Sequence, residues 1–132
     1  MHCMKHTLSI ATLLATFSLG TVASEQETRH LIGLGALTFA DNCMKCHKID
    51  GYGEEALYPS LRDPGLLANK PLLIDTVLHG RSAPRRNGGE EDLMPALEFL
   101  TDREISAIIA FITNTWGDEV LLVSEEEIKA AR

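Results

Sequence analysis

The sequence predicts an all-α fold, and three observations support this prediction. Two capping boxes, Thr101 with Glu104 and Ser124 with Glu127, mark the starts of helices. After the first box, apolar residues recur at the i, i+3, i+4 and i+7 spacing of one helix face: Ile105, Ile108, Ile109 and Ile112. The sequence contains no convincing run of alternating apolar and polar residues, which is the pattern of a half-buried strand.

The first 23 residues have the three-part layout of an export leader. Met1–His6 is short and polar, Thr7–Gly20 is apolar and uncharged, and small residues follow at 21–23. We expect cleavage after residue 23, which makes the mature protein periplasmic and leaves a domain at 24–132. The alternative is an uncleaved anchor, but the apolar run is shorter than the roughly 20 residues that a spanning helix needs.

The first half of the mature chain contains one predicted helix. Residues 24–29 are polar, and we expect a loose N-terminus there. Apolar spacing predicts a helix over Leu31–Asn42, although Gly33 and Gly35 lower its intrinsic propensity. Frequent glycine and proline predict an irregular segment over 48–69.

Three helices are expected in the second half. Pro71–His79 has a proline where a first helical turn tolerates one, and a glycine follows as a C-cap. Residues 81–93 are expected to be a loop, and Asp102–Asn114 is the clearest helix. The domain core would span about 30–117, and the tail at 118–132 would end in a short helix.

The chain is acidic, with 19 Asp and Glu against 12 Lys and Arg. The leader contains one of the basic residues and no acidic one, so 11 against 19 remain in the mature chain, a balance of −8. Binding to nucleic acid needs clustered positive charge, and we therefore exclude that class of partner. The composition suits a soluble protein that meets its partners through charge steering. After the leader, no apolar run is long enough to span a membrane.

The motif with the most chemical information is Cys43-Met44-Lys45-Cys46-His47. It matches C-x-x-C-H, the attachment motif of c-type haem. Two cysteines three residues apart lie on one turn of the chain. From there each thiol can add to one of the two vinyl groups of the porphyrin. The next residue then presents its imidazole to the iron. The motif predicts one covalent haem c held through Cys43 and Cys46, with His47 as the proximal ligand.

Three other interpretations of the motif compete with haem attachment. A thioredoxin-like redox pair occurs near a βαβ pattern, whereas a predicted helix precedes this motif. A structural zinc site needs four ligands, and the mature chain has no further cysteine and only His30 and His79 besides His47. A simple disulfide would leave His47 without a role. The export leader also agrees with haem attachment.

The predicted second axial ligand is Met94. After removal of the leader the methionines are Met44 and Met94, and Met44 lies inside the attachment turn, where it is badly placed to cross to the other haem face. A methionine ligand raises the reduction potential of haem iron. The alternatives are that Met94 fills the core, a common use of methionine, and that His79 or an open position takes its place.

Around these residues, positions 30–117 resemble the class I cytochrome c family. Gly35 and Phe39 stand eight and four residues before Cys43, and Ile108 and Phe111 match an aliphatic–x–x–aromatic pattern of the last family helix. The resemblance implies a small all-α cytochrome c fold with helices wrapped around one haem, and two helices that cross closely at the glycine.

The resemblance also implies roles for residues outside the motif. Pro59 matches a family proline whose carbonyl oxygen would accept a hydrogen bond from His47. Five apolar residues would line the haem pocket: Leu61, Leu66, Leu67, Leu73 and Val77. The ending Asn114-Thr115-Trp116-Gly117 looks like bacterial members found with periplasmic dehydrogenases and oxidases, although Trp116 could instead be a packing residue.

These observations predict an electron-transfer protein rather than an enzyme. Two strong axial ligands leave little room for substrate, so the expected function is the transfer of single electrons between redox partners such as a dehydrogenase, reductase or terminal oxidase. The alternative is a haem enzyme or gas sensor with an open iron position. Arg81, Arg85 and Arg86 form a basic cluster that would pair a haem propionate, steer a partner, or belong to a solvated loop.

Overall fold

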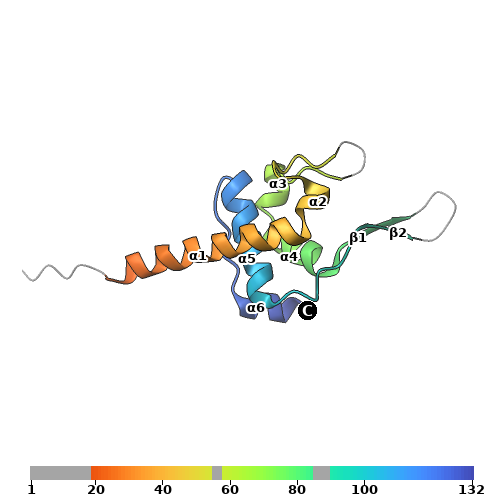
Figure 1. The fold of residues 1–132 in the computed structure, drawn as a ribbon. Helices are drawn as coiled ribbons and strands as arrows, with labels where there is room; N and C mark the ends of the chain where they lie inside the picture. Colours follow the sequence, from red (N-terminus) through yellow and green to blue (C-terminus); the bar gives the residue numbers. More distant parts are fainter. Residues whose placement is uncertain (1–18, 55–57, 85–89) are drawn as a thin grey trace, which may run out of the picture.

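The computed structural model describes residues 19–54, 58–84 and 90–132. Its helices are α1 (Leu19–Asn42), α2 (Met44–His47), α3 (Pro64–Leu67), α4 (Lys70–His79), α5 (Asp102–Trp116) and α6 (Glu125–Ala131), and its strands are β1 (Arg81–Pro84) and β2 (Glu90–Met94). The fold is mostly helical, which confirms the predicted class. Figure 1 shows α1 lying across α5, with α3, α4 and α6 grouped around α5.

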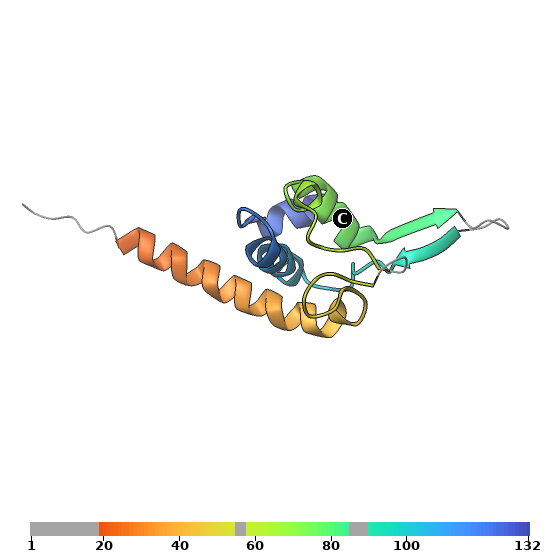
Figure 2. The ribbon, with the colours of Figure 1, turned by 90° about the horizontal axis from the view of Figure 1, so that it is seen from above.

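The prediction of a loop at 81–93 is wrong, because strands β1 and β2 pair there as an antiparallel ribbon. Arg81 lies opposite Met94, and an irregularity follows between Arg81 and Ser82. Figure 2 shows that the ribbon projects from one end of the molecule. Strands this short contain too few residues to display alternation, but Asn87-Gly88 in the sequence is a hairpin turn signal that could have indicated the pairing.

Helix α1 is longer than predicted, and the loose N-terminus expected at 24–29 is wrong. Residues 24–32 contain neither glycine nor proline, so nothing local ends the helix there. Arg103 of α5 also fixes the early part of α1, since its guanidinium lies 2.8 Å from the Glu27 carboxylate. The N-terminal part extends past the other helices (Figures 1 and 2). None of the helices in the described ranges combines the length and apolar character needed to cross a membrane.

Helix α3 lies within residues 48–69, where the sequence predicted irregular structure and no helix. Asp63 caps it, because the side-chain oxygen accepts hydrogen bonds from the backbone of Gly65 at 2.8 Å and Leu66 at 3.3 Å. Pro64 occupies the first turn. An Asp-Pro pair is a helix-start signal, but one turn is too short to show helical periodicity.

The contact between α1 and α5 depends on Gly35. A Cβ atom at this position would overlap the Ala107 carbonyl group and the Phe111 side chain. Beside the glycine, three aromatic rings pack together, with centroids 5.3 Å apart for Phe39 and Phe111 and 5.5 Å for Phe39 and Trp116. Such tilted and edge-on pairs are favourable arrangements of aromatic rings. The close helix crossing predicted at the glycine is therefore present, and Trp116 packs within it.

The capping boxes predicted for the last two helices are both formed. Thr101 Oγ1 accepts a hydrogen bond from the Glu104 backbone at 3.2 Å, and Ser124 caps α6 through Glu127 in the same way. The isoleucine face of α5 is buried, and Ile109 has no exposed surface. Helix α5 thereby forms the centre of the core against which α1, α3, α4 and α6 pack.

The C-terminal tail is part of the packed core. Ile128 of α6 is fully buried, and the Ser106 hydroxyl donates a hydrogen bond to the carbonyl oxygen of Val123. At the chain end, the Arg132 guanidinium lies 2.6 Å from the Asp102 carboxylate. These contacts join residues after α5 to the first two turns of that helix.

We therefore expect Ile128→Ala to lower the free energy of unfolding by about 2–5 kcal/mol, the usual cost of an unfilled cavity at a buried aliphatic site. Denaturant unfolding of the mature protein measures this change. Glu126→Ala on the exposed side of the same helix is the matched control, and we expect a change within about 0.5 kcal/mol. Similar values for both variants would mean that α6 contributes no core packing.

Candidate functional site

A cavity of about 260 Å³ brings the predicted site residues together. Cys43, Cys46 and His47 line it, and Met94 reaches it from the end of β2, nearly fifty residues later in the chain. Pro59, the predicted partner of His47, also lies on its wall. The remaining lining residues are Asn42, Tyr58, Leu61, Leu66, Thr76, Arg81, Pro95 and Leu97.

A single tight turn presents the motif to this cavity. Helix α1 ends directly before Cys43, whose backbone N–H donates to the Phe39 carbonyl at 2.8 Å. The His47 N–H then donates to the Cys43 carbonyl at 2.9 Å, which closes the turn. Cys43 is buried and Cys46 half-buried, and their thiols are not joined in a disulfide. Both sulfurs and the imidazole therefore enter the cavity from one short segment.

The orientation of His47 is set by the backbone of Pro59. The His47 Nδ1 atom lies 3.1 Å from the Pro59 carbonyl oxygen. A carbonyl oxygen only accepts hydrogen bonds, so Nδ1 must hold the proton, and Nε2 keeps a free lone pair. Gly53 permits this approach, because it has a φ of +70° and a Cβ there would overlap the carbonyl oxygens of Tyr58 and Pro59.

Burial keeps the Cys43 thiol and the His47 imidazole neutral at neutral pH. Desolvation, with a smaller contribution from the neighbouring Cys46, raises the pKa of the Cys43 thiol to about 11. Desolvation lowers the pKa of His47, and the hydrogen bond to Pro59 offsets part of that change. At neutral pH the imidazole is therefore in its neutral form, which is the form that ligates a metal.

The apolar lining agrees only partly with the sequence-based expectation. Leu61 and Leu66 line the cavity as predicted. Leu67, Leu73 and Val77 do not line it and are instead buried in the hydrophobic core. Positions 66 and 67 are consecutive in the single turn of α3, so their side chains leave the helix in different directions. The sequence alone does not show which one faces the cavity.

Sequence reasoning missed Thr76, which introduces a polar atom into the apolar wall. Its hydroxyl oxygen is buried and has no hydrogen-bond partner among the described residues. The position follows Leu73 by three residues, which places it on the inward face of α4, and this spacing could have indicated it. Buried polar groups are nearly always paired, so this hydroxyl fits a cavity that receives a group with polar substituents.

Other candidate residues lie elsewhere or outside the described part. His79 does not line the cavity, and its Nδ1 atom is 3.1 Å from the Asp75 carboxylate. His30 is exposed on α1. Arg85 and Arg86 lie outside the described residues. Within residues 19–54, 58–84 and 90–132, no group of three or more His, Cys, Asp and Glu side chains is arranged to hold a metal ion.

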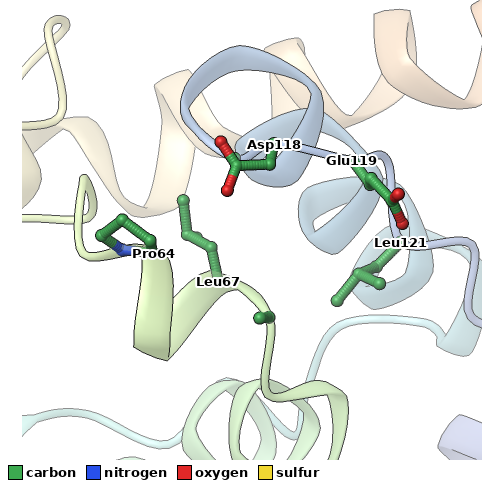
Figure 3. A pocket seen from close by; sticks show the side chains of 7 residues that line it. Pro64, Leu67, Asp118, Glu119 and Leu121 are labelled. Atoms are coloured by element: carbon green, nitrogen blue, oxygen red, sulfur yellow. The ribbon is translucent and has the colours of Figure 1, made fainter.

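A second hollow, of about 320 Å³, lies between α3 and the segment after α5 (Figure 3). Its lining is Pro64, Leu67, Ala68, Gly117, Asp118, Glu119 and Leu121. This lining contains no thiol, imidazole or thioether, so the hollow has none of the chemistry predicted from the motif. The cavity at the motif is therefore the candidate site.

A helical domain with two free thiols, an imidazole and a thioether around an apolar cavity defines a class of protein that binds a prosthetic group. The family model for cytochrome c matches residues 32–116, which include the C-terminal part of α1, the whole of α5 and every residue that lines the cavity. The chain belongs to the cytochrome c family, whose members bind haem c covalently and transfer electrons.

Curated relatives are cytochrome subunits of dehydrogenases. The cytochrome c subunit of an alcohol dehydrogenase (quinone) from Gluconacetobacter polyoxogenes is 29% identical over 89 residues, which cover 64% of this chain and 19% of the relative. The fructose dehydrogenase cytochrome subunit from Gluconobacter japonicus is 32% identical over 108 residues, covering 74% of this chain and 22% of the relative. The chain spans about a fifth of the length of these relatives.

Proposed function

We propose that the mature protein is a periplasmic monohaem cytochrome that carries single electrons between redox proteins. The observation that supports this function best is the cavity shared by Cys43, Cys46, His47 and Met94. Family membership provides the electron-transfer role, and the residues around the cavity provide ligands of the right chemical types.

In this proposal each site residue has one task. Cys43 and Cys46 would form the two thioether bonds, and His47 Nε2 and the Met94 sulfur would ligate the iron, while Pro59 holds the imidazole in its orientation. The bound haem supplies a centre that gains and loses one electron. The apolar side chains around it limit water access and thereby tune the reduction potential.

The proposed location and partners come from the leader and the relatives. Most of the leader lies outside the described residues, so its cleavage after residue 23 remains a prediction from its sequence pattern. The relatives are named as cytochrome subunits of dehydrogenases, and this supports a dehydrogenase as one redox partner of the chain. The protein would meet that partner either as a diffusible carrier or as a docked subunit.

The distal ligand decides between an electron carrier and a haem enzyme or gas sensor. We expect the haem-loaded protein to show a reversible one-electron response, no carbon monoxide binding, and the near-infrared charge-transfer band of methionine-ligated ferric haem. Met94→Ala should abolish that band, open the iron to carbon monoxide and lower the potential, because it removes the thioether ligand. Absorption spectroscopy and voltammetry measure these changes.

Met44→Leu is the matched control, since Met44 is the other methionine of the mature chain and lies within the attachment turn. We expect it to keep the band and the potential. If the unaltered protein already binds carbon monoxide and lacks the band, the iron has an open position and the carrier function is wrong.

A further inference from the structure

Close packing of its own side chain does not fix Met94. The residue is half-buried, and besides the cavity at the motif it lines a further hollow of about 430 Å³, whose walls include Gly80, Pro95 and Ala96. Methionine is also unbranched and has three rotatable bonds, so its sulfur can take many positions. The position of the sulfur in the cavity therefore depends on the backbone from which the side chain starts.

The backbone at Met94 is stiff and is held at both ends. Pro95 fixes its own φ angle and restricts the residue before it to extended conformations. Beyond Pro95, the Leu97 N–H donates a hydrogen bond to the Val77 carbonyl oxygen at 3.1 Å, and the Leu97 side chain is buried. On the other side, Met94 pairs with Arg81 at the base of the ribbon. The segment from Met94 to Leu97 is therefore a stiff piece of chain held against the end of α4.

Gly80 forms the closest contact between this segment and α4. Its N–H donates to the Thr76 carbonyl oxygen at 3.0 Å and ends the helix, and its φ is +72°, a conformation that L side chains rarely adopt. A Cβ atom there would lie 2.8 Å from the Pro95 carbonyl carbon and from the Ala96 nitrogen, and closer still to the Met94 carbonyl oxygen. All three are backbone atoms, so no change of side-chain rotamer could relieve the overlap.

The overlap is large enough to displace a ligand. Non-bonded carbon atoms in contact lie about 3.5 Å apart or more. To increase a separation of 2.8 Å to that value, the Met94–Ala96 backbone would have to move by roughly 0.7 Å. Groups that bind a ligand need to be held within about 0.5 Å of their working geometry. A side chain at position 80 would therefore move the starting point of the Met94 side chain beyond that tolerance.

We propose that Gly80 is a positioning residue for the distal ligand: because it has no side chain, the end of α4 packs directly against the Met94–Ala96 backbone and sets how far the Met94 sulfur reaches into the cavity. This inference rests on the proposed function, because it requires haem in the cavity with Met94 as its ligand. It extends that function, since a residue with no metal-binding atom would determine how firmly the thioether is held on the iron.

Titration of the ferric haem-loaded protein with imidazole measures how firmly Met94 is held. Added imidazole binds the iron only where the thioether has left, so its apparent affinity scales with the fraction of protein in which Met94 is displaced. In Gly80→Ala we expect this affinity to rise by about tenfold or more. The near-infrared band should weaken, and the reduction potential should fall toward that of Met94→Ala. Absorption spectroscopy and voltammetry measure these changes.

Pro95→Gly tests the same contact without adding an atom beside α4. It removes the ring that makes the segment stiff, while Gly80 itself stays unchanged. We expect the imidazole affinity to rise in this variant too, by less than in Gly80→Ala. If Gly80→Ala does not accumulate as a folded protein, Pro95→Gly decides the question, and a wild-type imidazole affinity in it would overturn the inference.

Gly35→Ala is the matched control, because it adds the same methyl group at another glycine in close contact with backbone atoms. Gly35 lies at the α1–α5 crossing and does not line the cavity. The variant should lose stability but keep the wild-type band, potential and imidazole affinity. An equal rise in imidazole affinity in Gly35→Ala would mean that general loss of stability releases Met94, and the inference would be wrong.

The outcomes distinguish this inference from the function on which it rests. If Gly80→Ala folds and keeps the wild-type band, potential and imidazole affinity, the glycine does not position the ligand. If the unaltered protein already lacks the band and binds imidazole as readily as Met94→Ala does, Met94 is not the distal ligand. That second result would refute the proposed function itself, whatever the Gly80 variant shows.

Discussion

Replacing both Cys43 and Cys46 with alanine should yield a polypeptide that holds no covalent porphyrin. The two thiols lie on one cavity wall and are free of a disulfide, so each is placed to form a thioether bond. We expect the double variant to be colourless after denaturing extraction, and its intact mass should equal that of the polypeptide alone. Mass spectrometry and haem staining of denaturing gels measure both properties.

Lys45→Ala is the matched control for this change. Lys45 lies between the two cysteines on α2 but is exposed and does not line the cavity. We expect this variant to retain covalent haem at the wild-type level. The single variants Cys43→Ala and Cys46→Ala should each keep no more than one thioether bond. Porphyrin that stayed covalently attached in the double variant would show that other residues form the linkage.

The second large effect concerns the crossing of α1 and α5. Gly35→Ala should lower the free energy of unfolding by about 1–3 kcal/mol, because the added methyl group would overlap the Ala107 carbonyl and force the helices apart. Alanine has the higher helix propensity, so propensity alone would predict a gain. Denaturant unfolding followed by circular dichroism measures the difference.

For Gly33→Ala, in the same helix, we expect the opposite change in the free energy of unfolding. Gly33 is exposed, and a Cβ atom there would meet nothing within 4 Å. We expect this variant to be more stable by about 0.5–1 kcal/mol, since alanine restricts the unfolded chain and favours the helix. Equal effects at the two glycines would mean that close approach of the helices does not determine the choice of glycine.

The helices that hold the site were predictable because their signals are local. Isoleucine spacing and a capping box define α5, and a second capping box defines the start of α6. The motif at Cys43–His47 also needs only neighbouring residues, since one turn sets the relative positions of its thiols and imidazole. Family resemblance added Pro59, whose carbonyl oxygen lies against His47.

The sequence by itself therefore determined the helical class, the central helices and the attachment motif, all of which depend on residues a few positions apart. Only the tertiary structure decided that β1 pairs with β2, that Leu66 rather than Leu67 faces the cavity, and that Thr76 and Arg81 line the same cavity as Met94. These features depend on which distant segments meet, and local periodicity contains no information about such meetings. Burial then raises the pKa of Cys43 and leaves the Thr76 hydroxyl without a partner among the described residues, and burial exists only once the chain has packed.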